Sequence, residues 1–127
     1  MVSPIRLSAV DRAWLLMDRP TNPMMIVALL VLSRPLDRLT LSALIKERFL
    51  TFERFRCYPS AELLNANWVE AREFDVDTHV LAAALPRRAG QKELEELIGV
   101  LASTPFNACR PLWSFHIVER YRGGSAV

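Results

Sequence analysis

The chain has 127 residues, of which 51% are hydrophobic and 24% charged, and its formal net charge is +2. This length and composition suit one domain with a real core, and they exclude an intrinsically disordered protein. The basic residues are spread along the chain and form no block, which excludes a nucleic-acid-binding footprint.

The first predicted element is a helix over residues 9–17. Ser8 is its expected N-cap, and Asp11 stands three residues later, as in a capping box. Its apolar positions recur at helical spacing and are Val10, Ala13, Trp14 and Met17. We expect this face to pack on the domain, with contact to a membrane surface as the alternative.

Residues 24–32 form the longest apolar run. The run is rich in Ile, Val and Leu and does not alternate with polar residues, which is typical of a strand buried on both faces of a sheet. We therefore expect a central strand. Its nine residues are about half of the ~20 that a membrane-spanning helix needs, so no transmembrane segment is predicted.

A longer helix is predicted over residues 38–52, with Asp37 or Thr40 as N-cap. Its expected inward stripe is Leu41, Leu44, Ile45, Phe49 and Phe52. Two short strands should follow, one from Phe55 to just before Pro59 and one over residues 68–71, joined by a loop at 61–67.

The segment 74–80 alternates apolar and polar residues, as an extended chain does. Asp75, Asp77 and His79 would then share one side and could offer ligands to a metal ion. Side chains on alternate strand residues stand roughly 6–7 Å apart, so without a bend they cannot all reach one ion at ~2 Å. A solvated or backbone-bonded face is the preferred interpretation.

The last predicted helix covers residues 91–103 and is ended by Pro105. Its expected inward residues are Leu94, Leu97, Ile98 and Leu101, and its outward residues are charged. The charged face is interpreted as a solvated surface.

The C-terminal segment predicts a half-buried strand over residues 113–121, with the turn Gly123-Gly124 and a return strand from Ser125. Trp113, Phe115, Ile117 and Tyr121 fall on its apolar side, and His116 falls on its polar side. We expect His116 to be a surface residue, with a catalytic role as the alternative. An aromatic-rich strand at an open edge is an aggregation hazard. We therefore expect that the chain is incomplete and that, in isolation, it is poorly soluble or associates with itself.

Cys57 and Cys109 lie far apart, outside any Cys-x-x-Cys spacing and without a signal peptide. A reduced, cytoplasmic setting is therefore expected. Both are interpreted as ordinary small core residues, with a catalytic thiol as the alternative.

Five motifs follow one another along the chain. They are Leu7-Ser8-Ala9-Val10-Asp11, Asn22-Pro23-Met24, Arg54-Phe55-Arg56, Phe74-Asp75-Val76-Asp77-Thr78-His79-Val80, and Arg110-Pro111-Leu112-Trp113 with its following strand and Gly-Gly turn. In this order and spacing they resemble the bacterial wax ester synthase/diacylglycerol acyltransferase family over nearly all of the chain. The family usually has His at the position of Met25 and tends to have Pro-Arg at Glu53-Arg54.

The resemblance implies an α/β fold, part of the N-terminal sandwich of the CoA-dependent acyltransferase fold, with a mixed sheet and flanking helices. In that family the strand after the glycine turn leads to His-His-x-x-x-Asp-Gly, in which a histidine is the general base. This chain has only His79 and His116 and lacks the motif, so no catalytic residue is assigned in it. We expect residues 1–127 to be an incomplete N-terminal acyltransferase domain.

The implied reaction transfers a fatty acyl group from acyl-CoA, which is a substrate and not a cofactor, to a long-chain alcohol or to diacylglycerol. The expected partners are these lipids and the remainder of the same enzyme, at a membrane or lipid-inclusion surface reached by peripheral contact. Neither a metal nor nucleic acid is expected, and the isolated chain is expected to be inactive. The alternative function is a non-catalytic module that binds a lipid or a partner.

Two groups of residues are the candidate site. Pro111, Leu112 and Trp113 match a family motif near the substrate region, and they are interpreted either as a substrate wall or as a packing device at the start of a strand. Trp113 is expected where the hairpin meets the helix 91–103. Met24 and Met25 could line an acyl-chain tunnel, because thioethers adapt to flexible apolar ligands, or fill the core.

Overall fold

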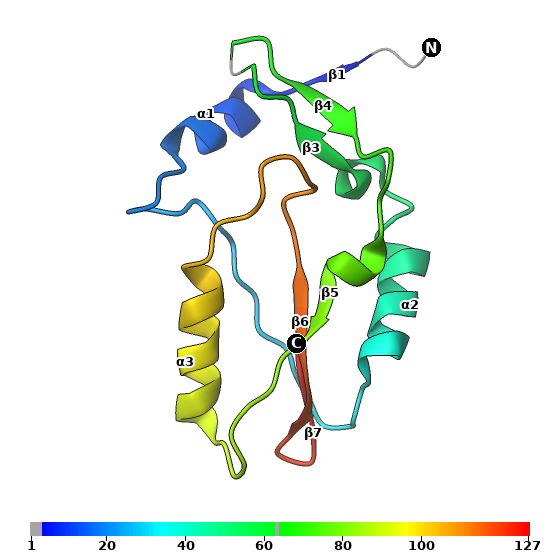
Figure 1. The fold of residues 1–127 in the computed structure, drawn as a ribbon, viewed down its shortest axis with the longest axis vertical. Coiled ribbons are helices and arrows are strands. Elements are labelled where there is room, and N and C mark those ends of the chain that lie inside the picture. Colours follow the sequence, from blue (N-terminus) through cyan, green and yellow to red (C-terminus); the bar gives the residue numbers. More distant parts are fainter. Residues whose placement is uncertain (1–3, 63) are drawn as a thin grey trace.

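Within residues 4–62 and 64–127, which the computed structural model describes, the chain forms two small sheets and three α-helices (Figure 1). The helices are α1 (Ala9–Met17), α2 (Arg38–Arg48) and α3 (Gln91–Ala102). The strands are β1 (Ile5–Arg6), β2 (Val31–Leu32), β3 (Cys57–Pro59), β4 (Asn67–Glu70), β5 (Val80–Ala82), β6 (Phe115–Tyr121) and β7 (Gly124–Ala126). The predicted α/β class is confirmed.

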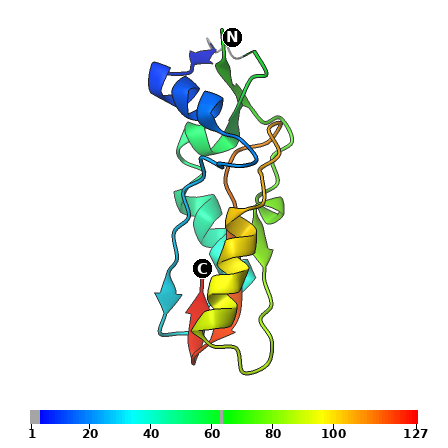
Figure 2. The same cartoon turned by 90° about the vertical axis from the view of Figure 1, so that its left-hand side faces the viewer.

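The two sheets occupy opposite ends of an elongated molecule (Figures 1 and 2). The order β1-β4-β3 makes an antiparallel sheet beside α1, and the order β2-β7-β6-β5 makes the main sheet. The main sheet is mixed, because β6 runs parallel to β5 and antiparallel to β7. Helix α2 covers one of its faces and α3 covers the other.

Strand β6 lies inside the main sheet, so the prediction that it stands at an open edge is wrong. It pairs with β5 on one side and with β7 on the other, and β7 in turn pairs with β2. The expected self-association rested on an unpaired β6 and therefore loses its physical basis.

Two apolar layers meet at β6, which is buried on both faces and not on one. Ile117 packs with Ile45 of α2, whereas Val118 packs with Leu94 of α3. Tyr121 lies with Val118 and not with Ile117 as predicted, because the ladder to β7 shifts register between Val118 and Tyr121. Such a shift moves every later side chain to the opposite face.

The β6–β7 turn is one residue earlier than predicted. Arg122 and Gly123 adopt positive φ angles of 49° and 80°, the conformation that a two-residue hairpin loop needs. Gly124 already belongs to β7. A Cβ atom there would stand 1.8 Å from the carbonyl oxygen of Leu32, so only glycine lets β2 approach this closely.

The apolar run 24–32 is an exposed edge segment, which contradicts the predicted central strand. Only Val31 and Leu32 form β2, and Leu30 exchanges two backbone hydrogen bonds with Val127 at 2.8 and 2.9 Å. Ile26 is 91% exposed. The composition resembled that of a buried strand, but the described chain places no further element on the outer side of this segment.

Helix α1 begins as predicted, with a reciprocal capping box between Ser8 and Asp11. Its predicted packing face is nevertheless exposed, since Val10 is 64% and Trp14 48% accessible. Polar contacts attach the helix instead: Asp11 pairs with Arg54 at 3.3 Å, and the guanidinium of Arg12 donates to the Leu64 carbonyl oxygen.

Most remaining elements follow the prediction with shifted ends, but the segment 74–80, predicted as extended, contains a 3-10 helix at Val76–Thr78. Helix α2 is capped by Asp37, which accepts from the Thr40 N–H at 2.8 Å, and it stops at Arg48, which leaves Phe52 outside the helix and exposed. Leu44 lies within α2 but is 44% exposed, so its predicted inward position is wrong. A 3-10 helix at Glu53–Arg56 occupies the predicted start of β3. Helix α3 is one residue shorter than predicted and β4 begins one residue earlier.

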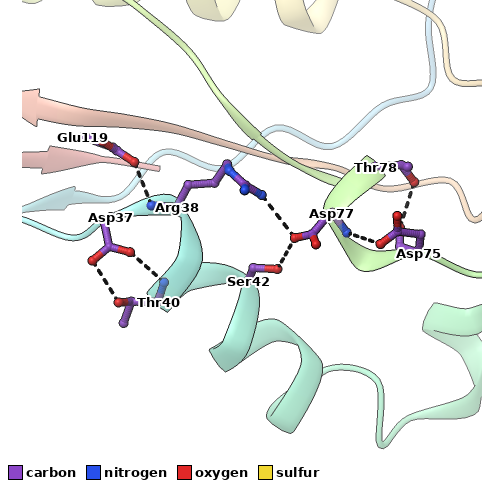
Figure 3. Close-up of polar contacts among 8 residues, drawn as sticks. All are labelled: Asp37, Arg38, Thr40, Ser42, Asp75, Asp77, Thr78 and Glu119. Carbon is purple, nitrogen blue, oxygen red and sulfur yellow. Dashed lines mark hydrogen bonds and ion pairs between the residues drawn. The ribbon is translucent and has the colours of Figure 1, made fainter.

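A polar network joins the start of α2 to the segment before β5 and to β6 (Figure 3). Asp77 accepts from the Ser42 hydroxyl at 2.8 Å and pairs with Arg38 at 3.1 Å. The backbone N–H of Arg38 donates to Glu119 of β6 at 2.8 Å. The network thereby fixes the positions of α2, the segment before β5, and β6 relative to one another.

The network should make stability depend on pH in the acid range. Its hydrogen bonds from Ser42 and Arg38 hold the pKa of Asp77 below its ordinary value of 3.8. A lowered pKa in the folded state contributes stability above the unfolded-state pKa, and this contribution is lost as pH falls through the folded-state pKa. Asp77→Asn should therefore unfold at lower urea concentration than the parent at neutral pH, with the difference shrinking below about pH 4.

Glu62→Gln is the matched control, since this exposed loop carboxylate makes no hydrogen bond among the described residues. The urea midpoints of Asp77→Asn and the parent could instead differ by the same amount from neutral to strongly acid pH. That result would contradict the assignment of the pH dependence to the Asp77 carboxylate.

Candidate lipid-binding site

An apolar cavity of about 490 Å³ lies between α3, the edge segment and the main sheet. Residues 25–30 form one wall, and Leu94, Leu97, Ile98 and Leu101 of α3 form another. Val118 of β6 and Ala126 of β7 also line it. Figure 2 shows α3 and the edge segment running along the same long axis. A volume of this size is ordinary for a small-molecule site, and its walls suit an aliphatic chain.

Polar groups gather in one part of this apolar cavity. Ser114 Oγ lies 3.1 Å from His116 Nε2, and both residues line the cavity. Burial lowers the pKa of His116 below its ordinary value, so the imidazole is neutral at pH 7. His116 was expected on the surface, and the structure makes it half-buried. A neutral imidazole can hydrogen-bond a polar head group in an otherwise apolar site.

His79 is buried in the same region. Its Nδ1 lies 2.7 Å from the Trp113 carbonyl oxygen, so this nitrogen carries a proton and donates to the carbonyl. His79 was grouped with Asp75 and Asp77 as a conceivable metal face, but the structure does not bring the three together. Asp75 accepts from the Asp77 N–H at 2.9 Å, whereas Asp77 binds Ser42.

No group of three or more His, Cys, Asp or Glu side chains that could hold a metal ion occurs in residues 4–62 and 64–127. Cys57 is buried in the small sheet, and burial raises the pKa of its thiol, which disfavours the thiolate. Cys109 is exposed, contrary to its interpretation as a core residue.

The Pro-Leu-Trp motif lies between the apolar cavity and the core. Pro111 is buried and Trp113 half-buried, and both line the cavity, whereas Leu112 does not. Trp113 packs mainly on the α2 side, contrary to the expected junction with α3, because its Nε1 donates to the Phe55 carbonyl oxygen at 2.8 Å. Its ring also lies 4.6 Å from that of His79.

The two candidate tunnel residues separate in the structure. Met25 lines the apolar cavity at the start of the edge segment. Met24 is half-buried outside the lining, and its N–H donates to the Asp18 carboxylate at 2.8 Å. The tunnel role remains a prediction for Met25 and has no geometric counterpart at Met24.

The sequence analysis missed most of the cavity lining. The α3 residues were assigned only to the core, and the edge segment was placed at the centre of a sheet. The pair Ser114 and His116 had a usable signal, because residues two apart on a strand share a face. None of the helices in the described part of the chain is long and apolar enough to cross a membrane.

Comparison with known proteins agrees with the motif pattern. The sequence profile of the wax ester synthase/diacylglycerol acyltransferase catalytic domain matches residues 7–126. A probable diacylglycerol O-acyltransferase of Mycobacterium tuberculosis is 34% identical over 120 residues, covering 90% of this chain and 44% of the relative. A putative diacylglycerol O-acyltransferase of Mycobacterium bovis is 32% identical over 126 residues, covering 93% of this chain and 25% of the relative.

The chain thus spans less than half the length of these relatives. No solved structure gives a significant match. The profile match nevertheless extends from Leu7, just before the N-cap of α1, to the end of β7 and includes both walls of the apolar cavity. The chain belongs to the wax ester synthase/diacylglycerol acyltransferase family.

Proposed function

We propose that this chain is the N-terminal part of an O-acyltransferase that moves a fatty acyl group from acyl-CoA to a long-chain alcohol or to diacylglycerol. The observation that carries the proposal is the apolar cavity between α3 and the edge segment, in a chain of this family. The names of the relatives support an acyltransferase that acts on diacylglycerol.

In this reaction the acceptor hydroxyl attacks the thioester carbonyl, the C–S bond breaks, and the hydroxyl proton passes through a general base to the departing CoA thiolate. The 127 residues contain no His-His-x-x-x-Asp-Gly motif. The proposal therefore assigns the general base to residues outside this chain. It assigns to this chain the wall that holds an aliphatic chain and excludes water.

Within this wall, Met25 and the edge segment would contact the aliphatic chain, and Pro111 and Trp113 would bound the polar part of the apolar cavity near His116. The neutral imidazole of His116 is suited to orient an ester or hydroxyl oxygen by a hydrogen bond. Both substrates partition into lipid, so we also propose peripheral contact with a membrane or lipid inclusion.

The test compares the purified 127-residue chain with the protein translated from its complete coding region. Each is supplied with palmitoyl-CoA and either hexadecanol or diacylglycerol, and free CoA is followed. We expect turnover by the complete protein and none by residues 1–127. Turnover by residues 1–127 alone would place the base in this chain, and a complete protein inert with both acceptors would exclude the reaction.

A cavity-filling variant links the reaction to this cavity. Ala28 lines the edge wall, and Ala28→Trp should reduce the preference of the complete protein for long over short acyl-CoA by about tenfold. Ala43→Trp, on the exposed face of α2, is the matched control and should leave the preference unchanged. An equal loss of activity with acyl-CoA of every chain length would mean that the acyl chain does not bind in this cavity.

The second candidate is a module that binds a lipid without reacting. The same cavity favours it, since an apolar wall without a catalytic motif can retain an aliphatic chain. Binding of a fluorescent fatty acid by both proteins, with no CoA release from either, would favour this module over the enzyme.

A further inference from the structure

A second cavity, of about 870 Å³, lies at the end of the molecule formed by the β6–β7 turn, the loop before α3 and the start of α2. It shares no lining residue with the apolar cavity. Figure 1 shows this turn and this loop side by side at the end opposite the small sheet. We call it the arginine hollow, because four arginines line it: Arg87, Arg88, Arg120 and Arg122.

The guanidinium groups of these four arginines are unpaired within the described residues. None takes part in the ion pairs or side-chain hydrogen bonds found in residues 4–62 and 64–127. Arg122 lies over the Tyr121 ring, 5.4 Å from its centroid. All four side chains are exposed to solvent and free to contact a ligand.

Two carboxylates also line the arginine hollow, and both are engaged by the start of α2. Asp37 accepts from the N–H and hydroxyl of Thr40, at 2.8 and 3.0 Å. Glu119 accepts from the N–H of Arg38. Four positive and two negative side chains therefore give the hollow a net charge of about +2, equal in sign and size to the charge of the entire chain.

The backbone adds an independent observation. Among the described residues, Arg88 and Arg122 are the non-glycine residues with positive φ, at 64° and 49°. Glycine or asparagine occupies such positions at lower cost, so arginine here is locally unfavourable. Both residues line the same hollow and lie in tight turns, so the two turns present arginine at positions where a smaller residue would cost less.

We propose that the arginine hollow is a phosphate-binding site. A guanidinium group presents a planar fork of N–H donors that matches phosphate oxygens, and several such groups around one hollow repel each other unless an anion lies between them. The phosphate belongs either to a phospholipid head group or to the nucleotide part of a CoA ester. The choice of these two ligands depends on the proposed function, whereas the proposal that the hollow binds phosphate does not.

The test uses the chain itself and measures binding, so it stays separate from turnover. Inorganic pyrophosphate, adenosine 3′,5′-bisphosphate and vesicles of phosphatidylglycerol with phosphatidylcholine are the probes, and pure phosphatidylcholine vesicles are the blank. We expect saturable binding that weakens as salt is raised. Preference for the bisphosphate identifies a nucleotide source, and preference for the anionic vesicles identifies a lipid source.

The decisive variant is Arg88→Asn with Arg122→Asn, which keeps residues that tolerate positive φ and removes two charges. It should weaken binding by at least about tenfold, while its stability is unchanged or raised. The control is Arg19→Asn with Arg72→Asn, which removes the same charge from exposed residues elsewhere. Absence of binding to every probe at low salt, or equal binding by the two double variants, would overturn the proposal.

Discussion

Trp113→Ala is expected to lower the free energy of unfolding by about 3–5 kcal/mol, the range for truncation of an aromatic core residue. The Trp113 ring lies within 6.3 Å of the rings of Phe55, Phe74, His79 and Phe115, measured between centroids. It therefore packs the 3-10 helix before β3 against the core between α2 and the main sheet. Urea denaturation followed by circular dichroism measures the change.

Trp113→Phe separates packing from hydrogen bonding. Phenylalanine keeps much of the apolar contact but leaves the Phe55 carbonyl oxygen without its donor, 2.8 Å away in the parent. This variant should lose about 1–3 kcal/mol, less than the alanine variant. If Trp113→Ala kept full stability while the complete protein lost activity, Trp113 would be a substrate-wall residue and not a packing residue.

Gly124→Ala is expected to destabilise the chain by about 3 kcal/mol, at the upper end of what overpacking usually costs. The added methyl group would stand 1.8 Å from the Leu32 carbonyl oxygen and 2.9 Å from the Ser33 carbonyl carbon. Both obstacles are backbone atoms and cannot rotate away as a flexible side chain would. The β2–β7 pairing must open to admit the methyl group, and thermal denaturation should show a lower midpoint.

Gly99→Ala is the matched control for this substitution. Gly99 lies within α3, and an added Cβ meets nothing within 4 Å. Alanine should therefore stabilise the helix by about 1 kcal/mol. Equal effects of the two substitutions would mean that Gly124 is not held against Leu32.

The elements that the sequence predicted well depend on local chemistry. The starts of α1 and α2 follow from Ser8 and Asp37, whose side chains bond N–H groups three residues on. The inner face of α3 follows from helical spacing. These signals lie within a few residues of each other and need no knowledge of the rest of the chain.

The failed predictions with the largest consequences concern what lies opposite an element. The composition of the apolar run 24–32 predicts a central strand. It does not indicate that only the last residues of the run pair with β7 and the residue after it. Strand β6 pairs with β7 on one side and with the parallel strand β5 on the other. In the sequence, the whole of α3 separates β5 from β6. Parallel pairing leaves no turn signature, so it could not be predicted from residues near β6.

The candidate site was predicted in part for the same reason. Met25, Pro111 and Trp113 were singled out and do line the apolar cavity. The α3 residues opposite them were not, because an amphipathic helix shows which of its faces is apolar but not whether that face meets a sheet or a cavity. The arginine hollow arises from three separated segments, and its charges look evenly dispersed along the chain.

The pairing of Leu30 with Val127 joins residues that are about three quarters of the chain length apart. Closing so long a loop costs more conformational entropy than closing the β6–β7 hairpin, which forms on a time scale of about 1–10 μs. The edge segment should therefore dock late in folding and detach early from the native state. Amide hydrogen exchange at Leu30 would then report the opening of the apolar cavity, well before exchange at β6 reports the unfolding of the entire sheet.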